Sequence, residues 1–539
     1  MKINGNTLWG FTLLSLFFVA CGSTENNNKN VFCYNESNGI TSLDPAFARD
    51  LEIMWATNQL FDGLVELNDS LQIIPSVAKS YSLSEDQLTY TFILRSDVVF
   101  HNNACFPNSI GRKVLATDVL FSFNRILDNA VASPGKWIFE KVTENGFSAP
   151  NDSTFIIQLK EPFAPFLGLL TTQYANIVPQ EAVDKYGSDF RNNPVGCGPF
   201  QFAFWYENVA LVFHKNPNYY LKDEQGNSLP YLDAVKIDFV KDMSAEYQGL
   251  LQGKYDFMSG LHNAFKDELL DPIGNLSSAY TSQLYLQKTP FIKTDYLGFV
   301  LDPQLQSNKA LLDPRVRKAL HLAINKKDMV KHLRNNTVIP ADFGFCSPAA
   351  AKKLNIQQRI SFNKKLALDL LAEAGFPNGN NLPTIVLSTT SDYADLMEYI
   401  QHEWQQLGIP CEIQQLQGAA FRDQASKCQL SVFRKSWLAD YAHPENFYSV
   451  FTTNRFTPNG PNYTHFSNSM YDEIYSEIGR TSSNDSMLVF SEQLETLLNN
   501  ETPVIPLYYD QVMHFIRSNI KNFPTNPVNM LDLRRVKKE

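Results

Sequence analysis

The sequence predicts a mixed α/β protein built from more than one lobe. Its 539 residues are several times the length of a typical single domain. Segments with the two-residue alternation of strands and segments with the spacing of helices both occur along the chain. We therefore expect two or three lobes, each with its own apolar core.

Residues 88–95 have the alternation of a half-buried strand. Apolar side chains occupy every second position, at Leu88, Tyr90, Phe92 and Leu94. Only Ile93 departs from the pattern. Successive side chains of a strand point to opposite faces, so this segment is predicted to bury one face.

A helix is predicted to begin at Asp313–Pro314. Asp313 suits the cap and Pro314 the first turn. Five apolar residues follow at i, i+3, i+4, i+7 and i+8: Val316, Ala319, Leu320, Ala323 and Ile324. That spacing places them on one face. The basic residues between them are expected to point mostly outward: Arg315, Arg317, Lys318, His321 and Lys326.

A second helix is predicted over residues 364–374. Leu366, Leu370 and Leu371 align along one side of it. Gly375-Phe376-Pro377 supplies a C-terminal stop, because glycine can adopt the left-handed conformation and proline cannot continue the helix. Both helices are expected to be scaffold elements.

The N-terminus has the pattern of an export signal. Lys2 precedes an apolar run from Leu8 to Ala20, which is too short to span a bilayer. The segment Phe18-Val19-Ala20-Cys21 resembles a lipoprotein lipobox, so we expect a signal peptide over residues 1–20 and lipidation at Cys21. A plain cleaved signal is the alternative. The polar residues 21–30 are expected to form a tether.

Composition excludes several functional classes. The content of 44% hydrophobic and 19% charged residues is that of a soluble globular protein, and no later segment has the long uncharged run of a membrane helix. The net charge of −10 is spread along the chain without a basic stripe, so no nucleic-acid partner is expected. Six cysteines besides Cys21 allow several disulfide pairings, which sequence leaves open.

No catalytic motif is found. His402-Glu403 begins like a zinc-protease helix, but Gln406 stands where the second histidine ligand belongs. The chain has no Gly-x-Ser-x-Gly elbow, no phosphate-binding loop and no dinucleotide fingerprint. We therefore expect neither enzymatic activity, nor a cofactor, nor a metal site.

Several segments, in order along nearly the whole chain, carry a family resemblance. They are Ser42-Leu-Asp-Pro-Ala46, Leu60-Phe-Asp-Gly-Leu64, Tyr90-Thr-Phe-Ile-Leu-Arg95, Pro194-Val-Gly-Cys-Gly-Pro-Phe200, Asp313-Pro-Arg-Val-Arg-Lys-Ala-Leu320, Leu371-Ala-Glu-Ala-Gly-Phe-Pro-Asn-Gly379, Trp437-Leu-Ala-Asp-Tyr441 and Pro503-Val-Ile-Pro-Leu-Tyr508. Together they resemble the extracellular solute-binding proteins of family 5, the peptide/nickel class of ABC importer receptors. Cys197 departs from the resemblance, since many relatives have threonine there.

The resemblance implies a two-lobed periplasmic-binding-protein fold of type II, cluster C, with an extra inserted domain. Lobe I is expected to comprise residues 31–67, 189–289 and 506–539. The inserted domain is expected at 68–188 and lobe II at 290–505. In such a fold the ligand is enclosed between the lobes, and closure creates the surface that the permease recognises.

The function implied is the substrate-binding component of a bacterial ABC importer that captures oligopeptides. Its expected partners are a peptide ligand, the permease and ATPase complex, and the membrane through the lipid anchor at Cys21. We expect an exported monomer in the periplasm or cell envelope. Alternatives are a receptor for non-peptide cargo (oligosaccharide, heme or nickel chelate) and a surface adhesion or signalling receptor of the same fold.

Three candidate ligand-binding residues follow from the resemblance. In peptide-binding relatives the acidic residue of the Trp-x-x-Asp segment pairs with the peptide α-ammonium, and Asp440 occupies that position. Arg434 matches an arginine that in some relatives meets the carboxylate of short peptides, and Trp437 would wall the pocket. The structural alternatives are a loop cap for Asp440, a core position for Trp437 and a surface ion pair for Arg434. A lone His443 is not expected to bind nickel or heme.

Overall fold

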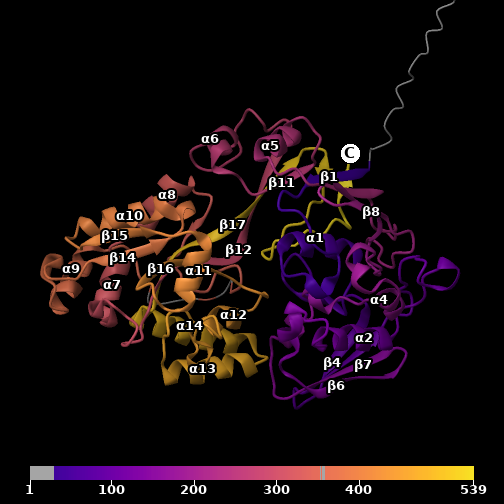
Figure 1. The fold of residues 1–539 in the computed structure, drawn as a ribbon, viewed down its shortest axis with the longest axis horizontal. Coiled ribbons are helices and arrows are strands. Elements are labelled where there is room, and N and C mark those ends of the chain that lie inside the picture. The colour runs from indigo at the N-terminus through magenta and orange to yellow at the C-terminus, as the bar shows by residue number, and fades with distance from the viewer. Residues whose placement is uncertain (1–29, 352–353, 355–358) are drawn as a thin grey trace, which may run out of the picture.

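The computed structural model describes residues 30–351, 354 and 359–539. One eleven-stranded sheet runs through both halves of the molecule (Figure 1). Its strands follow in the order β15 (Cys411–Gln415), β14 (Ile385–Thr389), β16 (Val432–Leu438), β12 (Leu284–Phe299), β17 (Val504–Arg517), β11 (Phe257–Ser259), β1 (Val31–Asn35), β10 (Ala234–Asp238), β9 (Ala210–Lys215) and β8 (Phe200–Tyr206). The short β13 (Ile339–Pro340) pairs with β17 off this path.

Two long antiparallel strands, β12 and β17, connect the two halves. Residues 284–290 of β12 pair with the C-terminal part of β17, and residues 294–298 pair with its N-terminal part. The register shifts between Pro290 and Thr294, and again between Asp295 and Tyr296. Such bulges bend a strand and loosen its ladder. The crossing from one lobe to the other is therefore irregular in a sheet that is otherwise continuous.

Lobe II, the half that contains β14, β15 and β16, has a helical layer on each face of the sheet. One core contains Leu297, Leu387 and Val432 from one sheet face, together with α7 (Pro314–Leu322), α8 (Lys326–Arg334), α9 (Lys364–Glu373) and α10 (Ala394–Gln405). The other contains Tyr296 and Phe433, together with α11 (Gly418–Ser426), α12 (Pro444–Tyr448), α13 (Ser469–Arg480) and α14 (Asn484–Glu501). Adjacent strand residues enter opposite cores, as the pleat requires.

The predicted helix at residue 314 is confirmed at its start. The Asp313 side chain accepts a hydrogen bond from the Arg315 amide, Pro314 is the first helical residue, and all five predicted apolar residues are fully buried. The predicted outward face is wrong at three positions, because Arg317, His321 and Lys326 are buried. A second layer, α14, packs against α7.

Two of these buried side chains, Arg317 and Lys326, donate hydrogen bonds to backbone carbonyl oxygens. The Arg317 guanidinium donates to the carbonyl oxygens of Leu311, Glu501 and Thr502. Lys326 donates to the Ala341 carbonyl and pairs with Asp342 at 3.7 Å. The helix predicted over residues 364–374 is present as α9, and Gly375 has a left-handed φ of 92°.

Lobe I contains the other end of the sheet, which packs against helix α1 (Leu51–Leu60). The C-terminal segment closes over this helix: the Trp55 indole donates to the Asn529 carbonyl at 2.6 Å, and the Gln59 amide donates to the Leu531 carbonyl at 2.7 Å. The remaining elements of this half are β2 (Val65–Leu67), β3 (Ile73–Pro75), α4 (Gln180–Tyr186), α5 (Met243–Leu251), α6 (Lys266–Leu269), β18 (Ile520–Lys521) and β19 (Lys537–Lys538).

A separate four-stranded sheet lies below lobe I in Figure 1, in the position of the predicted insertion. Its order is β4 (Ala78–Leu83), β5 (Thr89–Leu94), β7 (Thr154–Leu159) and β6 (Val142–Asn151), with α2 (Ala116–Leu127) against one face and α3 (Phe166–Leu169) nearby. The strand predicted at 88–95 is β5, and Tyr90, Phe92 and Leu94 are its buried residues. This sheet and its helices are called the inserted domain below.

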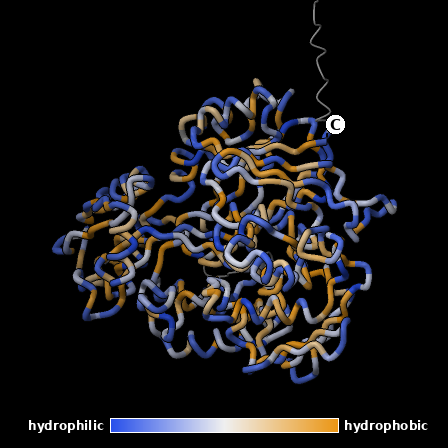
Figure 2. The backbone as a smooth tube through the Cα atoms, turned by 45° about the vertical axis from the view of Figure 1, so that its right-hand side comes forward, coloured by the Kyte–Doolittle hydropathy of each residue, from blue (hydrophilic) through white to orange (hydrophobic). Residues whose placement is uncertain are grey.

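Figure 2 shows hydrophobic and hydrophilic residues alternating along much of the chain, as expected of elements with one buried face. Within the described part of the chain, no helix has the length and apolarity needed to cross a membrane. The six described cysteines are free thiols. The predicted signal peptide, the predicted lipidation site Cys21 and the predicted tether up to residue 29 lie outside the described residues.

Candidate functional site

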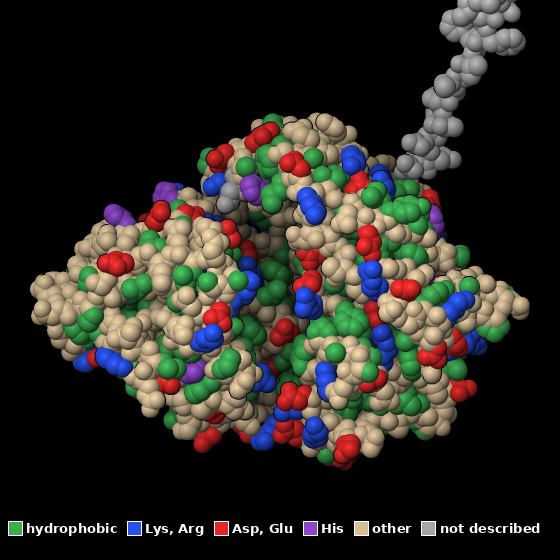
Figure 3. Space-filling view, in the orientation of Figure 1, with side chains coloured by type: hydrophobic (Ala, Val, Ile, Leu, Met, Phe, Trp, Pro, Cys, Tyr) green, Lys and Arg blue, Asp and Glu red, His purple; other side chains and the backbone are tan. Residues whose placement is uncertain are grey.

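A cavity of about 300 Å³ opens between the two halves of the molecule. Figure 3 shows the corresponding furrow between the halves, with charged side chains along its walls. Its lining comes from six separate regions: α1 and its approach, β2 and the turn after it, the inserted domain, β12, the end of β16 with the loop after it, and the C-terminal segment. Pockets of this size between lobes suit small organic ligands or short peptides.

One wall of the cavity is formed where β16 ends. Leu438, Ala439, Asp440 and Tyr441 all line it. On one side β16 pairs with β12 along its whole length, whereas on the other side β14 pairs only with Val432 and Phe433. Beyond Phe433, therefore, no described strand covers that edge of β16.

The uncovered edge carries free backbone groups. The Ala439 amide donates to the Ile292 carbonyl and the Val300 amide to the Ser431 carbonyl. Antiparallel ladders bond alternate residues, so the odd-numbered residues of β16 face β12. The amides and carbonyls of Ser436 and Leu438 consequently point to the open edge. An extended chain could hydrogen-bond there as an added strand.

Asp440 follows this edge, and its side chain is held by Asn446. The Asn446 Nδ2 donates to Asp440 Oδ2 at 3.3 Å, and the Asp440 amide donates to Asn446 Oδ1 at 3.2 Å. Desolvation at the cavity wall raises the pKa of Asp440 above its ordinary value. No described cation forms an ion pair with this carboxylate.

Trp437 lies beside the cavity and does not line it. Its indole Nε1 donates to the same Asn446 Oδ1 at 3.1 Å, and its ring packs against the second core of lobe II. The predicted role as a wall of the pocket is not seen in this cavity, whereas the structural alternative, packing against the core, is; the indole also fixes the loop that presents Asp440.

Arg434 is not brought together with Asp440. It lies on the opposite face of β16 from Trp437, forms an ion pair with the fully buried Asp295, and its guanidinium stacks over the Tyr393 ring. Burial lowers its pKa to about 10. The ion pair foreseen as its alternative role is present, but it is buried instead of lying on the surface.

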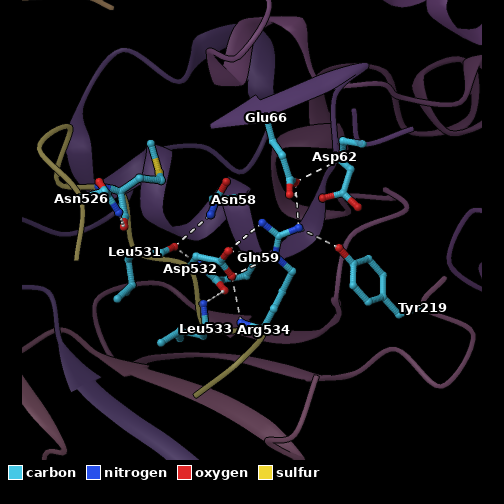
Figure 4. A network of polar contacts seen from close by, with 12 residues as sticks. Asn58, Gln59, Asp62, Glu66, Tyr219, Asn526, Leu531, Asp532, Leu533 and Arg534 are labelled. Atoms are coloured by element: carbon cyan, nitrogen blue, oxygen red, sulfur yellow. Dashed lines mark hydrogen bonds and ion pairs between the residues drawn. The ribbon is translucent and has the colours of Figure 1, made fainter. Parts of the chain in front are cut away.

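The lobe I wall contains a network centred on Arg534 (Figure 4). Its guanidinium donates to both oxygens of Asp532, to Glu66 at 2.8 Å and to the Tyr219 hydroxyl at 3.1 Å. Burial raises the pKa of Asp532, but the charge and hydrogen bonds of Arg534 outweigh this effect and hold it below the ordinary value. Arg534 thus already has its ion-pair and hydrogen-bond partners within the protein.

Sequence reasoning missed several cavity residues, among them Arg49, Asp69, Trp137, Tyr174 and Arg534. All lie in loops, turns, short 3-10 helices or the irregular C-terminal segment. No local periodicity marks such positions. The one available signal was that charged and aromatic loop residues concentrate at binding sites.

Within residues 30–351, 354 and 359–539, no group of three or more histidine, cysteine or acidic side chains lies close enough together to hold a metal ion. His443 caps α12, with its Nδ1 accepting from the Glu445 amide at 3.2 Å. His402 is exposed on α10, and Glu403 pairs with Lys364 at 3.6 Å.

Comparison with known proteins defines the family. The sequence model described as "Bacterial extracellular solute-binding proteins, family 5 Middle" matches residues 72–459, which is well over half of the chain. The chain belongs to the family 5 extracellular solute-binding proteins. The resemblance identified in the sequence is therefore confirmed.

Family 5 relatives match over almost the whole length. The dipeptide-binding protein DppE of Bacillus subtilis is 26% identical over 569 aligned positions, covering 98% of each chain. Heme-binding protein A of Haemophilus influenzae is 25% identical over 549 positions, covering 95% of each. The structure of HbpA2 from Haemophilus parasuis superimposes with a TM-score of 0.81 at 21% identity, covering 95% of this chain and 100% of the other.

The predicted type II, two-lobed fold with an extra domain is confirmed by these structural neighbours. The family is one of solute-binding proteins, and a cavity between lobes is a common place for a small-molecule site. The cavity at Asp440 is thus the candidate solute site of this chain.

Proposed function

We propose that this protein is the receptor of a bacterial ABC importer and that it captures oligopeptides. The observation that carries the proposal is the open edge of β16, which runs through Ser436 and Leu438 directly to the Asp440 carboxylate. A peptide is a ligand with both an ammonium group and a row of backbone donors and acceptors. The dipeptide-binding relative DppE supports the same class.

In the proposed complex, Asp440 receives the peptide α-ammonium. An ammonium removed from water needs an opposite charge and hydrogen-bond acceptors to offset its desolvation. Asp440 lacks an ion-pair partner among the described residues, and Asn446 fixes its position. The peptide backbone would pair with Ser436 and Leu438, so that affinity depends little on side-chain identity.

Two arginines are candidates for the peptide carboxylate. Arg49 lines the cavity, and 71% of its side chain is exposed. Its contact with Asp50, at 3.3 Å, is solvent-screened and therefore weak. Arg434, the candidate from the family resemblance, could serve only in a state in which Asp295 releases it. We propose Arg49 for peptides short enough to end within the cavity.

The peptide hypothesis is tested by thermal unfolding of residues 22–539 with a library of free peptides, after bound material has been removed by denaturation and refolding. Ligands of the native state raise the melting temperature by mass action. Free peptides are expected to do so, whereas N-acetylated peptides and the Asp440→Ala protein are expected to show no shift. Stabilisation by heme instead of peptides would favour the cargo of heme-binding protein A.

We further propose that Cys21 is the lipidated first residue of the mature protein and that the chain acts outside the cytoplasm as a monomer without enzymatic activity. The lipobox-like segment ending at Cys21 supports the anchor. Membrane fractionation tests it, since Cys21→Ser should move the protein to the soluble fraction. A mixed peptide pool incubated with the protein should remain uncleaved.

A further inference from the structure

The inserted domain touches lobe II at the rim of the cavity. Trp137, in a short 3-10 helix of that domain, stacks on Tyr441 of lobe II with ring centroids 6.4 Å apart and an interplanar angle of 26°. Both rings line the cavity. Tyr441 directly follows Asp440, so the contact lies one residue from the proposed ammonium site.

Tyr441 is a residue of lobe II, but its side chain is part of the apolar core of the other half of the molecule. It is 7% exposed, and it is the only residue of segment 290–505 among the described members of the lobe I core. Its hydroxyl donates to Glu445, which also accepts from the Tyr475 hydroxyl. The ring is therefore fixed to lobe II at one end and packed against the other half of the molecule along its face.

Trp137 is also held in place from its own side. Ser133 caps its 3-10 helix and donates to the Ala46 carbonyl at 2.6 Å. Gly135 approaches Tyr174 so closely that a Cβ there would lie 2.3 Å from the ring. A stacked pair fixed on both sides loses little conformational entropy when it forms.

A second contact joins the same two bodies. The Ala164 amide donates to the Gly479 carbonyl of α13 at 2.8 Å. A Cβ built at Gly479 would lie 3.8 Å from the Phe163 ring, and the pKa of Glu161 is lowered by its bond to Lys141 and by the charge of Arg480 across the contact. The inserted domain and lobe II thus meet at two places.

We propose that Trp137 and Tyr441 are positioning residues which couple ligand capture to closure of the cavity. A ligand that engages Asp440 fixes the loop after β16, and that loop carries Tyr441 onto Trp137. The inserted domain then acts as the counter-surface for lobe II. This inference deepens the proposed function, because it assigns a role to the inserted domain at the same site.

The test combines kinetics with small-angle X-ray scattering on Trp137→Ala, Tyr441→Ala and the double variant, using tri-alanine as probe. Each single variant is expected to bind about tenfold more weakly, mainly through faster dissociation. The double variant should be no weaker than the singles, since both remove one contact. Trp137→Phe should restore part of the loss, and Tyr206→Ala, an exposed aromatic on β8, should change nothing.

Scattering separates this inference from the peptide proposal. Trp137→Ala is expected to raise the radius of gyration of the ligand-free protein, whatever its cargo. If the native protein ignores tri-alanine but the radius still rises in the variant, the coupling contact stands and the peptide claim falls. An unchanged radius together with unchanged dissociation of tri-alanine would overturn the role of Trp137.

Discussion

Asn446 holds Asp440 at two points, accepting from its amide at 3.2 Å and donating to its carboxylate at 3.3 Å. The same Asn446 oxygen accepts from the Trp437 indole. One buried amide thus fixes both the tryptophan and the aspartate of the Trp-x-x-Asp segment. The relative positions of Trp437 and Asp440 are therefore set by Asn446, a residue outside the motif.

Asn446→Ala is expected to weaken ligand binding by about 1–2 kcal/mol, because the Asp440 carboxylate loses its fixed orientation. Isothermal titration with a stabilising peptide measures this loss. Asn462→Ala is the matched control: Asn462 is equally buried in lobe II, bonds the carbonyls of Thr452 and Phe466, and is absent from the cavity lining. Equal loss of affinity in both variants would contradict a specific role for Asn446.

Arg434 is expected to matter first for stability. Arg434→Met leaves the Asp295 carboxylate, whose side chain is 0% exposed, without its main counter-ion. Removal of one partner of a buried ion pair costs about 3–5 kcal/mol. Urea denaturation should show this loss, and Arg434→Met with Asp295→Asn should recover most of it. If the double variant is no more stable than the single one, the pair is not the source of the effect.

Basic peptides are expected to bind more tightly than neutral ones. The Asp69 carboxylate lines the cavity and forms no ion pair with any described cation. The same is true of the Asp440 carboxylate. In the proposed complex the peptide α-ammonium binds Asp440, so Asp69 remains available to attract a lysine side chain of the peptide. Replacing a central alanine by lysine should improve affinity by about two- to fivefold at low salt.

That preference should disappear in Asp69→Asn and at high ionic strength, because both remove the attraction. Asp86→Asn serves as control, since Asp86 is a fully exposed acid on the inserted domain outside the cavity lining. A lysine preference that survives in Asp69→Asn would assign it to another residue.

Stability is expected to fall between about pH 4.5 and 7 through Glu495. Burial raises the pKa of this carboxyl from 4.5 to about 7, although it accepts from the Phe345 and Cys346 amides. Across that window the folded state binds the proton more tightly than the unfolded state. Stability is therefore greatest below the unfolded pKa and decreases until the folded pKa is passed.

Glu495→Gln cannot ionise, so relative to the native protein it should gain roughly 3 kcal/mol between pH 4.5 and 7.5. Urea midpoints of the two proteins at several pH values measure this difference. The comparison cancels the opposite contribution of His101 and His514, whose pKa values burial lowers to about 4. A constant difference across the window would show that Glu495 does not titrate there.

Periodicity predicted β5, α7 and α9 because each buries one face against a single core. It misplaced Arg317 and His321, since α7 is covered on a second side by α14. It also misplaced Lys326, the first residue of α8, which is buried beside Ala341 and Asp342. The family resemblance predicted Asp440 from a motif at the end of one strand, and Asp440 does line the cavity. Sequence reasoning could not find Asp69, Trp137 or Arg534, which reach the cavity only through the packing of segments far apart in the chain.

The position of β17 governs how the molecule is assembled. Residues 504–517 pair with β11, β12 and β13 in the middle of the large sheet, so both lobes depend on a strand that follows all the other strands of that sheet in the sequence. Such long-range pairing delays folding until most of the chain is available. A nascent chain stopped before residue 504 would lack the central strand, and its exposed β12 edge would make it a substrate for chaperones and proteases.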